Sequence, residues 1–501
     1  MSGWTPRTLG EFLAAAPREA PALVTPTRRL TYGELHDSAL RVARAMHALG
    51  LKKGDHAAIL MGNDEYWLAL FYGAALLGVV TVPVNTRFKA AELEFCLRQA
   101  DCQAVFLAPT FLNNDYASML RAVRAPKLKH RIVLGEASWR KFAALDRGQA
   151  LHAQVAPDDL LLIQFTSGTT AYPKGVMLTH DNMLRNAWAS GQRVGIRAED
   201  RYFNCRPFFH VGGSTLSALM SLVHGACLVT RPSFEAGAAL EMMEMERCTL
   251  TSGNDTIFQL LMAHPDFPKR RLVLRGGWAA AGPETMRRII DLLGAKHICA
   301  AYGLSEASPN VVMSDWRDPE ALRVQGLATP HEGLHLRTLE GEIQVRGWSV
   351  MRGYYKNPEA TAAAFTADGF LRTGDLGEVH PGGRLRMIGR LKDVFRVGGE
   401  NVAPAEVEEV LLAHPAVAVA QVIGVPDARL GEVPCAYVAL KAGQAAGAQE
   451  LIDWTKARCA NFRVPRYVKV VADFEALGMT ASGKVQKGRL REHALREFGL
   501  A

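Results

Sequence analysis

The chain has 501 residues, of which 49% are hydrophobic and 22% are charged, and its formal net charge is +8. This composition excludes a disordered, collagen-like or coiled-coil protein, and the length corresponds to about three domains of ~150 residues each. The basic residues form no long run, so the charge gives no support to nucleic-acid binding and only weak support to small anionic ligands.

The cysteines and the start of the chain bear on location. The eight cysteines are scattered and none forms a CxxC pair, a pattern typical of reduced thiols rather than of a zinc site or a disulfide framework. The first residues, MSGWTPRTLGEF, lack the apolar stretch of a secretory signal. We therefore expect a cytoplasmic location.

The first half of the chain alternates between helical and strand patterns. Residues 35–50 have the period of an amphipathic helix, and HAAIL (56–60) is typical of a strand. Residues 66–86 carry no charge and are long enough to span a bilayer. Pro83 and the β-branched residues around it predict instead a buried helix that ends near Gly78, followed by a strand. We therefore expect no membrane span.

Further strands are predicted at 104–108, 131–135 and 160–165, and the alternation predicts an α/β protein with parallel sheets. A boundary is expected near Arg390–Lys392, because glycine-rich turns precede it and a new series of strand and helix patterns follows. The predicted domains are therefore 1–390 and 391–501. Residues 441–450 are expected to form a surface loop before a helix.

The first motif with chemical content is TSGTTAYPKG (166–175), which follows the strand predicted at 160–165. Its small and hydroxyl residues allow backbone N–H groups to converge on phosphate oxygens, and Lys174 adds a positive charge. A solvated turn has a similar composition. Five residues separate Gly168 from Lys174 and a glycine follows the lysine, so the motif is no Walker A loop. Phosphate binding remains open, whereas a P-loop ATPase is disfavoured.

Three further motifs place polar residues on turns. AYGLSEAS (301–308) offers a tyrosine that can stack on a flat base and a glutamate that can hold a divalent metal, although a capped helix start has the same pattern. TGDLG (373–377) and GRLKD (389–393) offer an aspartate and an arginine to ribose hydroxyls, or form a β-turn and a surface strand. TASGK (480–484) carries a lysine that is otherwise just exposed.

Taken together, the order and spacing of these motifs resemble the adenylate-forming superfamily, which includes acyl-CoA synthetases, adenylation domains of peptide synthetases and beetle luciferases. The resemblance runs from LTYGEL (30–35) to SGKVQKGRLRE (482–492). It implies the adenylate-forming enzyme fold, an α/β fold with a large N-terminal domain of parallel-sheet α/β subdomains and a small mobile α+β C-terminal domain. It also implies that a carboxylate attacks the α-phosphate of ATP, and that a thiol attacks the resulting acyl-adenylate after the C-terminal domain rotates.

By match to the family's motifs, the resemblance assigns the residues that bind ATP. The phosphates would contact Thr166, Ser167, Gly168, Thr169, Thr170, Lys174 and Ser305, and the adenine and acyl group would lie beside Ala280, Ala281, Gly282, Tyr302 and Gly303. Asp375 would bind the ribose hydroxyls with help from Arg390, and Glu306 would ligate Mg²⁺.

Residues near the C-terminus would serve both half-reactions. Lys484 would be the catalytic lysine of adenylation, Lys392 would lie at the hinge, and Gly398 and Gly399 would line the path of the pantetheine arm. No carrier domain follows the lysine motif, which favours free coenzyme A as the thiol acceptor.

Two segments bear on which kind of carboxylic acid the protein would use. FFHVGGST (208–215) matches the family's acyl-pocket motif, with His210 at its gate, although a buried histidine is more often part of a core. No acidic residue near it could pair with a substrate ammonium, so we expect an uncharged tail, either a fatty chain or an aromatic ring. Asp255, before TIFQLL, is expected to cap a helix rather than to contact substrate.

The sequence thus predicts an ATP-dependent acid–CoA ligase for an apolar carboxylic acid such as a fatty acid, acting as a monomer or homodimer. Two alternatives stay open: a stand-alone adenylation enzyme that loads an aryl or acyl group onto a carrier protein, and a non-catalytic nucleotide-binding relative. The second is motivated by Ala171 and Ala300, where most members have Gly and many have Asn or Gln, respectively. Gly478 and Met479 also depart from a common Pro-containing approach to the lysine loop.

Overall fold

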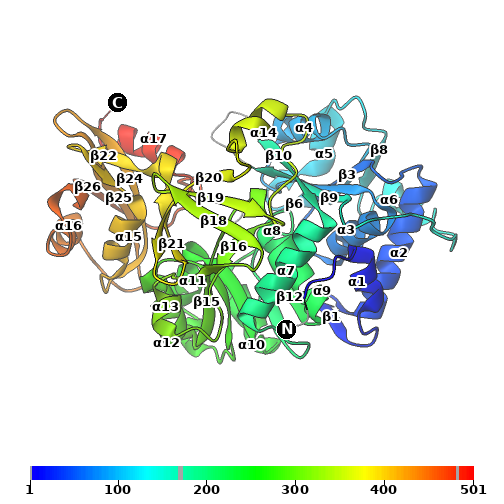
Figure 1. The fold of residues 1–501 in the computed structure, drawn as a ribbon, viewed down its shortest axis with the longest axis horizontal. Coiled ribbons are helices and arrows are strands. Elements are labelled where there is room, and N and C mark those ends of the chain that lie inside the picture. The colour runs from blue at the N-terminus through cyan, green and yellow to red at the C-terminus, as the bar shows by residue number, and fades with distance from the viewer. Residues whose placement is uncertain (1–2, 167–172, 481–483, 501) are drawn as a thin grey trace.

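The computed structural model describes residues 3–166, 173–480 and 484–500. These residues form four sheets of four or more strands. Sheet I has six strands, sheet II nine, sheet III four and sheet IV five. Sheets I and II, with their helices, form the larger part of the molecule. The C-terminal lobe, coloured orange to red, lies at one end of the long axis, opposite the N-terminal helices (Figure 1).

Sheet I has the strand order β10-β9-β4-β3-β5-β8, and its pairs are parallel except for β9 with β10. The parallel strands predicted from the sequence are therefore present. Its strands and helices, with the β6–β7 hairpin, are β3 (His56–Leu60), β4 (Val80–Pro83), β5 (Ala104–Leu107), β6 (Thr110–Phe111), β7 (Asn114–Asp115), β8 (His130–Val133), β9 (Leu160–Thr166), β10 (Lys174–Thr179), α2 (Tyr32–Ala48), α3 (Glu65–Leu77), α4 (Ala90–Gln99), α5 (Tyr116–Ala122) and α6 (Ala137–Ala143).

The uncharged segment 66–86 is a helix followed by a strand, as predicted. Helix α3 begins where the Asp64 carboxylate accepts the backbone N–H of Trp67 at 2.8 Å. It ends at Gly78, whose φ of 74° belongs to the left-handed region that glycine adopts at least cost. In the described part of the chain, no helix has the length and apolar character needed to cross a membrane.

Sheet II has nine strands in the order β17-β16-β15-β14-β13-β11-β12-β1-β2 among the described residues, with a parallel centre and antiparallel edges. Its strands are β1 (Pro21–Val24), β2 (Arg29–Thr31), β11 (Arg201–Asn204), β12 (Cys227–Thr230), β13 (Leu250–Asn254), β14 (Gly276–Ala280), β15 (His297–Gly303), β16 (Asn310–Met313) and β17 (Thr329–Pro330). Its helical elements are α1 (Leu9–Ala15), α7 (His180–Val194), α8 (Val211–Gly213), the π-helix η1 (Ser214–Leu219), α9 (Met220–His224), α10 (Ala236–Met245), α11 (Asp255–Ala263), η2 (Phe267–Lys269), α12 (Pro283–Leu293), η3 (Ser305–Ala307) and α13 (Glu320–Val324).

Sheet III is antiparallel throughout, which the expectation of parallel sheets did not foresee. Short turns join β18 to β19 and β20 to β21, and such turns allow only antiparallel pairing. The β19–β20 pair is antiparallel as well, although the segment between these strands contains α14. Its elements are β18 (Leu334–Leu339), β19 (Glu342–Gly347), α14 (Pro358–Ala364), β20 (Leu371–His380) and β21 (Arg384–Arg390).

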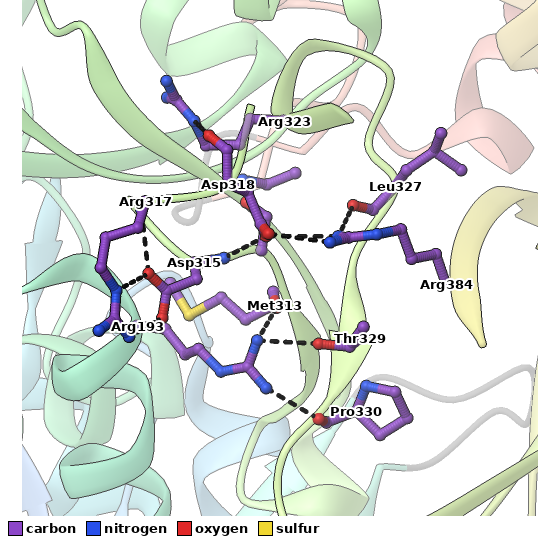
Figure 2. A network of polar contacts seen from close by, with 12 residues as sticks. Arg193, Met313, Asp315, Arg317, Asp318, Arg323, Leu327, Thr329, Pro330 and Arg384 are labelled. Carbon is purple, nitrogen blue, oxygen red and sulfur yellow. Dashed lines mark hydrogen bonds and ion pairs between the residues drawn. The ribbon is translucent and has the colours of Figure 1, made fainter. Parts of the chain in front are cut away.

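A polar network joins sheet III to sheet II (Figure 2). Arg384, at the start of β21, donates through Nη2 to Asp318 Oδ1 at 2.8 Å and through Nη1 to the Leu327 carbonyl at 3.1 Å. Asp318 also accepts the backbone N–H of Asp315 at 2.8 Å. The arginine thus holds the strand that leads toward the C-terminal lobe against the loop before α13.

Replacing Arg384 by leucine is expected to lower the free energy of unfolding of this region by about 1–3 kcal/mol, because the partly buried Asp318 carboxylate loses a charged partner. The measurement is the midpoint of thermal unfolding. Arg317→Leu is the matched control: the Arg317 side chain is 58% exposed and, among the described residues, bonds only to Asp315 in its own loop, so it joins no two sheets and a smaller change is expected. Equal midpoints for the Arg384 variant and the wild type would contradict the assignment.

The C-terminal lobe has its own sheet and its own core. Sheet IV runs β23-β22-β25-β24, with β26 parallel to β25, and the buried residues of its hydrophobic cluster all lie between Phe395 and Ala494. This is the predicted α+β arrangement. The elements are η4 (Leu391–Asp393), β22 (Phe395–Val397), β23 (Glu400–Val402), α15 (Pro404–Leu412), β24 (Val417–Asp427), β25 (Gly431–Leu440), α16 (Ala448–Lys456), η5 (Asn461–Arg463), β26 (Tyr467–Val471) and α17 (Lys487–Glu497).

The loop predicted at 441–450 is shorter than expected, because α16 already begins at Ala448. The Glu450 carboxylate accepts the backbone N–H of Gly447 at 3.2 Å, which satisfies a backbone donor at the start of this helix. All eight cysteines are free thiols, and seven of them are buried.

Candidate active site

The carboxyl ends of the parallel strands of sheet II carry several of the predicted residues. In the register of the sheet, Asn254 at the end of β13 lies opposite Ala280 at the end of β14. Gly303 ends β15, and a Cβ there would lie 1.9 Å from the Pro309 carbonyl oxygen, so only glycine allows this close backbone contact. Ligands of α/β proteins bind at this edge. The predicted adenine and acyl-group residues Ala280, Ala281, Gly282, Tyr302 and Gly303 therefore lie at one sheet edge.

Tyr302, Asp375 and Arg390 form a contact cluster between sheets II and III. The Tyr302 hydroxyl donates to Asp375 Oδ2 at 2.9 Å, and Arg390 Nε lies 3.6 Å from Asp375 Oδ1. Asp375 is 6% exposed, and its burial raises the pKa of the carboxyl although Arg390 acts in the opposite sense. The strand pair β20–β21 places Asp375 directly across from Arg390. The family resemblance assigned Tyr302 to the adenine and Asp375 with Arg390 to the ribose of the same nucleotide.

Lys484 of the C-terminal lobe lies near enough to this cluster for Arg390 and Asp375 to act on its charge. The turn that carries it is closed by two hydrogen bonds: Thr480 N–H donates to the Lys484 carbonyl at 2.7 Å, and Lys484 N–H donates to Thr480 Oγ1 at 2.9 Å. Arg87 of the larger lobe donates through Nη1 to the Met479 carbonyl at 2.8 Å, which docks the turn.

Lys484 as a residue is exposed, yet the protein packed around its ammonium lowers the pKa of Lys484 to about 8. Loss of hydration is the main cause; Arg390 and Arg206 also lower this pKa, and Asp375 opposes them. The lysine therefore lies within electrostatic reach of residues from sheets II and III.

This pKa predicts an alkaline limit for adenylation. A lysine with a lowered pKa is charged below about 8 and neutral above it, so the kcat/KM of acid-dependent pyrophosphate exchange is expected to fall as pH rises through 8. Lys484→Arg is the control, because a guanidinium stays charged and its residual activity should lack this limb. A wild-type profile that stays flat up to pH 10 would refute the assignment.

His210 follows β11 and lies beside the same group of charges. Its Nδ1 accepts the backbone N–H of Gly212 at 3.0 Å, which caps α8 and leaves the ring proton on Nε2 in the neutral form. Burial, together with Arg206 and Lys484, lowers the pKa of His210 to about 3, so the imidazole stays neutral at physiological pH. It is thus a neutral wall residue close to Lys484.

Lys174, Tyr354 and Glu306 connect the phosphate motif to the AYGLSEAS motif. Lys174 pairs across the β9–β10 hairpin with Thr166, and its Nζ lies 5.0 Å from the centre of the Tyr354 ring. The Tyr354 hydroxyl donates to Glu306 Oε1 at 3.0 Å. Ser305, predicted at a phosphate, is the buried first residue of η3. The predicted Ser167, Gly168, Thr169 and Thr170, and the departure at Ala171, lie outside the described residues.

The donor set fits a metal that is shared with a bound phosphate. One Glu306 oxygen accepts from Tyr354, and a carboxylate with a second oxygen available suits Mg²⁺, which uses one or two carboxylates together with substrate phosphates. Among the residues described, no cluster of three or more His, Cys, Asp or Glu side chains could hold a metal alone.

Two models of known families match the chain. The AMP-binding enzyme model matches residues 11–355, and the AMP-binding enzyme C-terminal domain model matches residues 406–484.

The chain belongs to the AMP-binding enzyme family.

Individual relatives agree with this assignment to the adenylate-forming superfamily and, within it, to the acyl-CoA synthetases. The chain is 36% identical to the putative acyl-CoA synthetase YngI of Bacillus subtilis, covering 99% of this chain and 98% of that protein. It is 38% identical to the 3-[(3aS,4S,7aS)-7a-methyl-1,5-dioxo-octahydro-1H-inden-4-yl]propanoyl:CoA ligase of Mycobacterium tuberculosis, covering 97% and 99%. The predicted family is confirmed.

Solved structures with a similar fold also belong to enzymes of this kind. The crystal structure of the anthranilate CoA ligase AuaEII in complex with anthranoyl-AMP superposes with a TM-score of 0.90 at 25% identity, over 99% of this chain and 98% of that one. The predicted adenylate-forming enzyme fold is therefore confirmed, and the protein is an acyl-CoA synthetase by family.

Three predicted residues are not part of this cluster. Lys392 is exposed in η4, the single turn between β21 and β22. Gly398 and Gly399 form the β22–β23 turn with φ of 59° and 98°. Gly398 N–H donates to the Leu430 carbonyl at 2.8 Å, and the Gly399 carbonyl accepts from Arg396 at 3.3 Å, both within the C-terminal lobe.

The expected cap at Asp255 is wrong. Asn254 caps α11 by accepting the backbone N–H of Ile257 at 3.1 Å, and Asp255 is the first helical residue. Asp255 instead accepts the backbone N–H of Gly282 at 3.1 Å, which ties the end of β13 to the start of α12. Burial raises the pKa of Asp255 to about 6.

The sequence reasoning did not single out Arg87, Arg206 or Tyr354. Arg87 bonds to the lysine turn, and Tyr354 bonds to Glu306. Burial and Arg206 lower the pKa of His210. None of the three lies in one of the glycine-rich motifs. Arg206 lies two residues before the acyl-pocket motif at 208–215, but its burial and its missing acceptors become visible only in the folded chain.

Proposed function

We propose that the protein joins a mainly apolar carboxylic acid to coenzyme A through an acyl-adenylate. The observation that carries this proposal is that Arg87 docks the lysine turn on the larger lobe, which brings Lys484 within electrostatic range of the Tyr302–Asp375–Arg390 cluster. Residues from sheet II, sheet III and the C-terminal lobe come together there, which supports a nucleotide held between two lobes.

In the first half-reaction, a carboxylate oxygen of the acid bonds to the α-phosphorus of ATP, and the bond from that phosphorus to the bridging oxygen breaks to release pyrophosphate. We assign the ribose hydroxyls to Asp375 and Arg390 and the adenine face to Tyr302. Lys484 and Lys174 stabilise the negative charge on the reacting oxygens, the effect that usually contributes most to such reactions. Mg²⁺, when bound by Glu306 and the phosphates, adds to this neutralisation.

Replacing Glu306 by alanine is expected to raise the Mg²⁺ concentration for half-maximal adenylation by about tenfold or more, because the proposed protein ligand is lost. A magnesium titration of pyrophosphate exchange measures this. Tyr354→Phe removes only the hydroxyl that orients the carboxylate, so a smaller shift is expected. An unchanged titration in Glu306→Ala would rule out metal ligation by this residue.

In the second half-reaction, a thiolate attacks the acyl carbon and AMP leaves. We propose that the segment 391–501 rotates about Lys392 as a domain relative to 1–390, so that Lys484 withdraws and the Gly398–Gly399 turn approaches the acyl group. The exposed η4 turn and the separate core of the C-terminal lobe support this. Coenzyme A is the proposed acceptor, and a carrier protein is the alternative.

The acid is proposed to lack an amino group near its carboxyl. Val211, Gly212 and Gly213, after the neutral His210, offer no carboxylate to a substrate ammonium, and an unpaired buried ammonium is costly. The Mycobacterium tuberculosis relative is named for an acid with a fused-ring skeleton, which supports an apolar frame for the acid used here.

The test is a panel of acids of different length and shape, supplied with ATP, Mg²⁺ and either coenzyme A or carrier proteins. We expect acid-dependent release of AMP and pyrophosphate and formation of the CoA thioester. Thioester on carrier proteins alone would favour the stand-alone adenylation enzyme. No exchange with any acid, by folded protein that binds ATP, would favour the non-catalytic alternative. A cytoplasmic location, supported by the eight free thiols, and a monomeric or dimeric state stay predictions.

A further inference from the structure

Arg206 is a buried cation next to the proposed acyl pocket. It follows β11 at the carboxyl edge of sheet II, and it is 4% exposed. Its guanidinium carbon lies 4.9 Å from the centre of the Trp278 ring, and a Cβ on Gly212 would lie 3.1 Å from its Nε. The side chain is therefore held between β14 and the glycine pair that follows His210.

Two donor nitrogens of this guanidinium lack acceptors in the described part of the chain. Its Nε and Nη1 are buried and make no hydrogen bond to any residue that the structure describes. Burial lowers the pKa of Arg206, and no carboxylate among the described residues opposes this effect. The nearby Lys484, which acts with Arg206 on His210, is a second cation. A buried charge without a counter-charge is costly. Buried groups left this way are often completed by a ligand or by water.

Trp278 adds a third unsatisfied donor beside the two of Arg206. Its indole Nε1 is buried and likewise has no acceptor among the described residues, although an indole N–H usually finds one. Trp278 lies on β14, two residues before Ala280, and its ring contacts the Arg206 guanidinium. Three unsatisfied donor atoms, two on Arg206 and one on Trp278, thus lie on neighbouring side chains at the acyl-group end of the site.

The groups common to every substrate already have partners in the proposed function. Lys174 is assigned to the phosphates, Lys484 to the reacting carboxylate, and Asp375 with Arg390 to the ribose. Arg206 lies instead beside His210 and Gly212, in the motif assigned to the acyl tail. A guanidinium there would bind an oxygen on that tail, because its planar donors match carboxylate and carbonyl oxygens.

We propose that Arg206 and Trp278 Nε1 bind an oxygen acceptor on the acid's tail, away from the carboxyl that is activated. The substrate class is therefore an oxo acid or a dicarboxylic acid with an otherwise apolar skeleton. This inference rests on the proposed acid–CoA ligase function and specifies its substrate. A second carboxylate would also neutralise the buried cation, whereas a ketone would only accept hydrogen bonds, so both are tested.

The experiment compares three acids of one skeleton at several chain lengths: the plain monocarboxylic acid, its distal oxo analogue and its dicarboxylic analogue. The readout is kcat and KM for each acid in pyrophosphate exchange. The wild type is expected to prefer an oxygen-bearing acid by about tenfold or more in kcat/KM, since a site built for a polar group rejects the analogue that lacks it. Arg206→Met should remove most of this preference, chiefly through KM.

Two further variants refine the result. Arg206→Lys keeps the charge without the planar donor pair, so it should retain the dicarboxylic acid better than the oxo acid. Trp278→Phe keeps a ring for the cation and removes Nε1, so it should lower the preference less than Arg206→Met. An ATP-induced rise in thermal midpoint shows that each variant is folded. If one variant shows no ATP-induced rise, the acid preference of the wild type and the results of the remaining variants still test the inference.

Three outcomes overturn the inference. One is a wild type that uses the plain acid as well as, or better than, both analogues. Another is an Arg206→Met variant that loses the same factor with all three acids, which would assign the guanidinium to the shared carboxyl or phosphates. In both cases the ligase function stands. The third, no exchange with any acid in the wild type, rejects the proposed function and this inference with it.

Discussion

Replacing Lys484 by alanine is expected to lower the rate of acyl-adenylate formation by about 10²–10³-fold, the usual loss when one donor to a developing negative charge is removed. The reason is that this ammonium is the C-terminal lobe's proposed contribution to the reacting oxygens, and it reaches the Asp375 and Arg390 surroundings. Thioester formation from a supplied acyl-adenylate should be largely spared, because no charge is then transferred to pyrophosphate. Acid-dependent pyrophosphate exchange and single-turnover thioester formation measure the two steps separately.

Lys456→Ala is the control for Lys484→Ala. Lys456 is an exposed lysine at the end of α16 in the same lobe, so its loss should leave both half-reactions near wild type. A Lys484→Ala variant that loses both half-reactions by the same factor would contradict the assigned role.

Replacing Lys392 by proline is expected to slow thioester formation by about tenfold or more and adenylation far less. Lys392 lies in η4, where the chain passes from β21 to the C-terminal lobe. Proline fixes φ near −65° and restricts the residue before it, so a rotation that needs new dihedral angles at this turn is hindered. The structure has Lys484 near the nucleoside cluster, and the variant should hold the lobes in that arrangement.

Lys392→Ala separates the backbone effect from the loss of charge, because alanine leaves φ free. It should transfer acyl groups to coenzyme A at close to the wild-type rate. If Lys392→Pro turns over normally, or if adenylation falls as much as transfer, the hinge assignment is wrong.

Local patterns predicted the parallel part of the fold well. The helix end at Gly78, the strand at 56–60 and the strand before the phosphate motif all depend on neighbours in the sequence. The antiparallel sheet III was not predicted, since alternation of strand and helix does not say which strand pairs with which. The ion pair of Asp318 and Arg384, which connects sheet II to sheet III, was not predicted either, because the two residues are far apart in the chain. The cap of α11 falls on Asn254 rather than Asp255 because Asn254 has the extended backbone of a cap residue.

In the candidate site, too, some residues were predicted from local motifs and others became visible only in the folded structure. Tyr302, Asp375, Arg390 and Lys484 were found through motifs, since each lies on or beside a turn of small residues. Arg206 has no such turn, and its significance comes from burial and from donors without acceptors, which only the packed structure reveals. The contact of Arg87 with the lysine turn likewise depends on how the two lobes dock.

The most direct test of the central claim follows the carboxylate oxygen. An acid that supports thioester formation is labelled with ¹⁸O in its carboxyl group and incubated with the protein, ATP, Mg²⁺ and coenzyme A, and the AMP is analysed by mass spectrometry. Attack of the carboxylate on the α-phosphorus predicts that each AMP carries one ¹⁸O atom and that pyrophosphate carries none. Unlabelled AMP, or ADP formed together with labelled phosphate, would contradict the account.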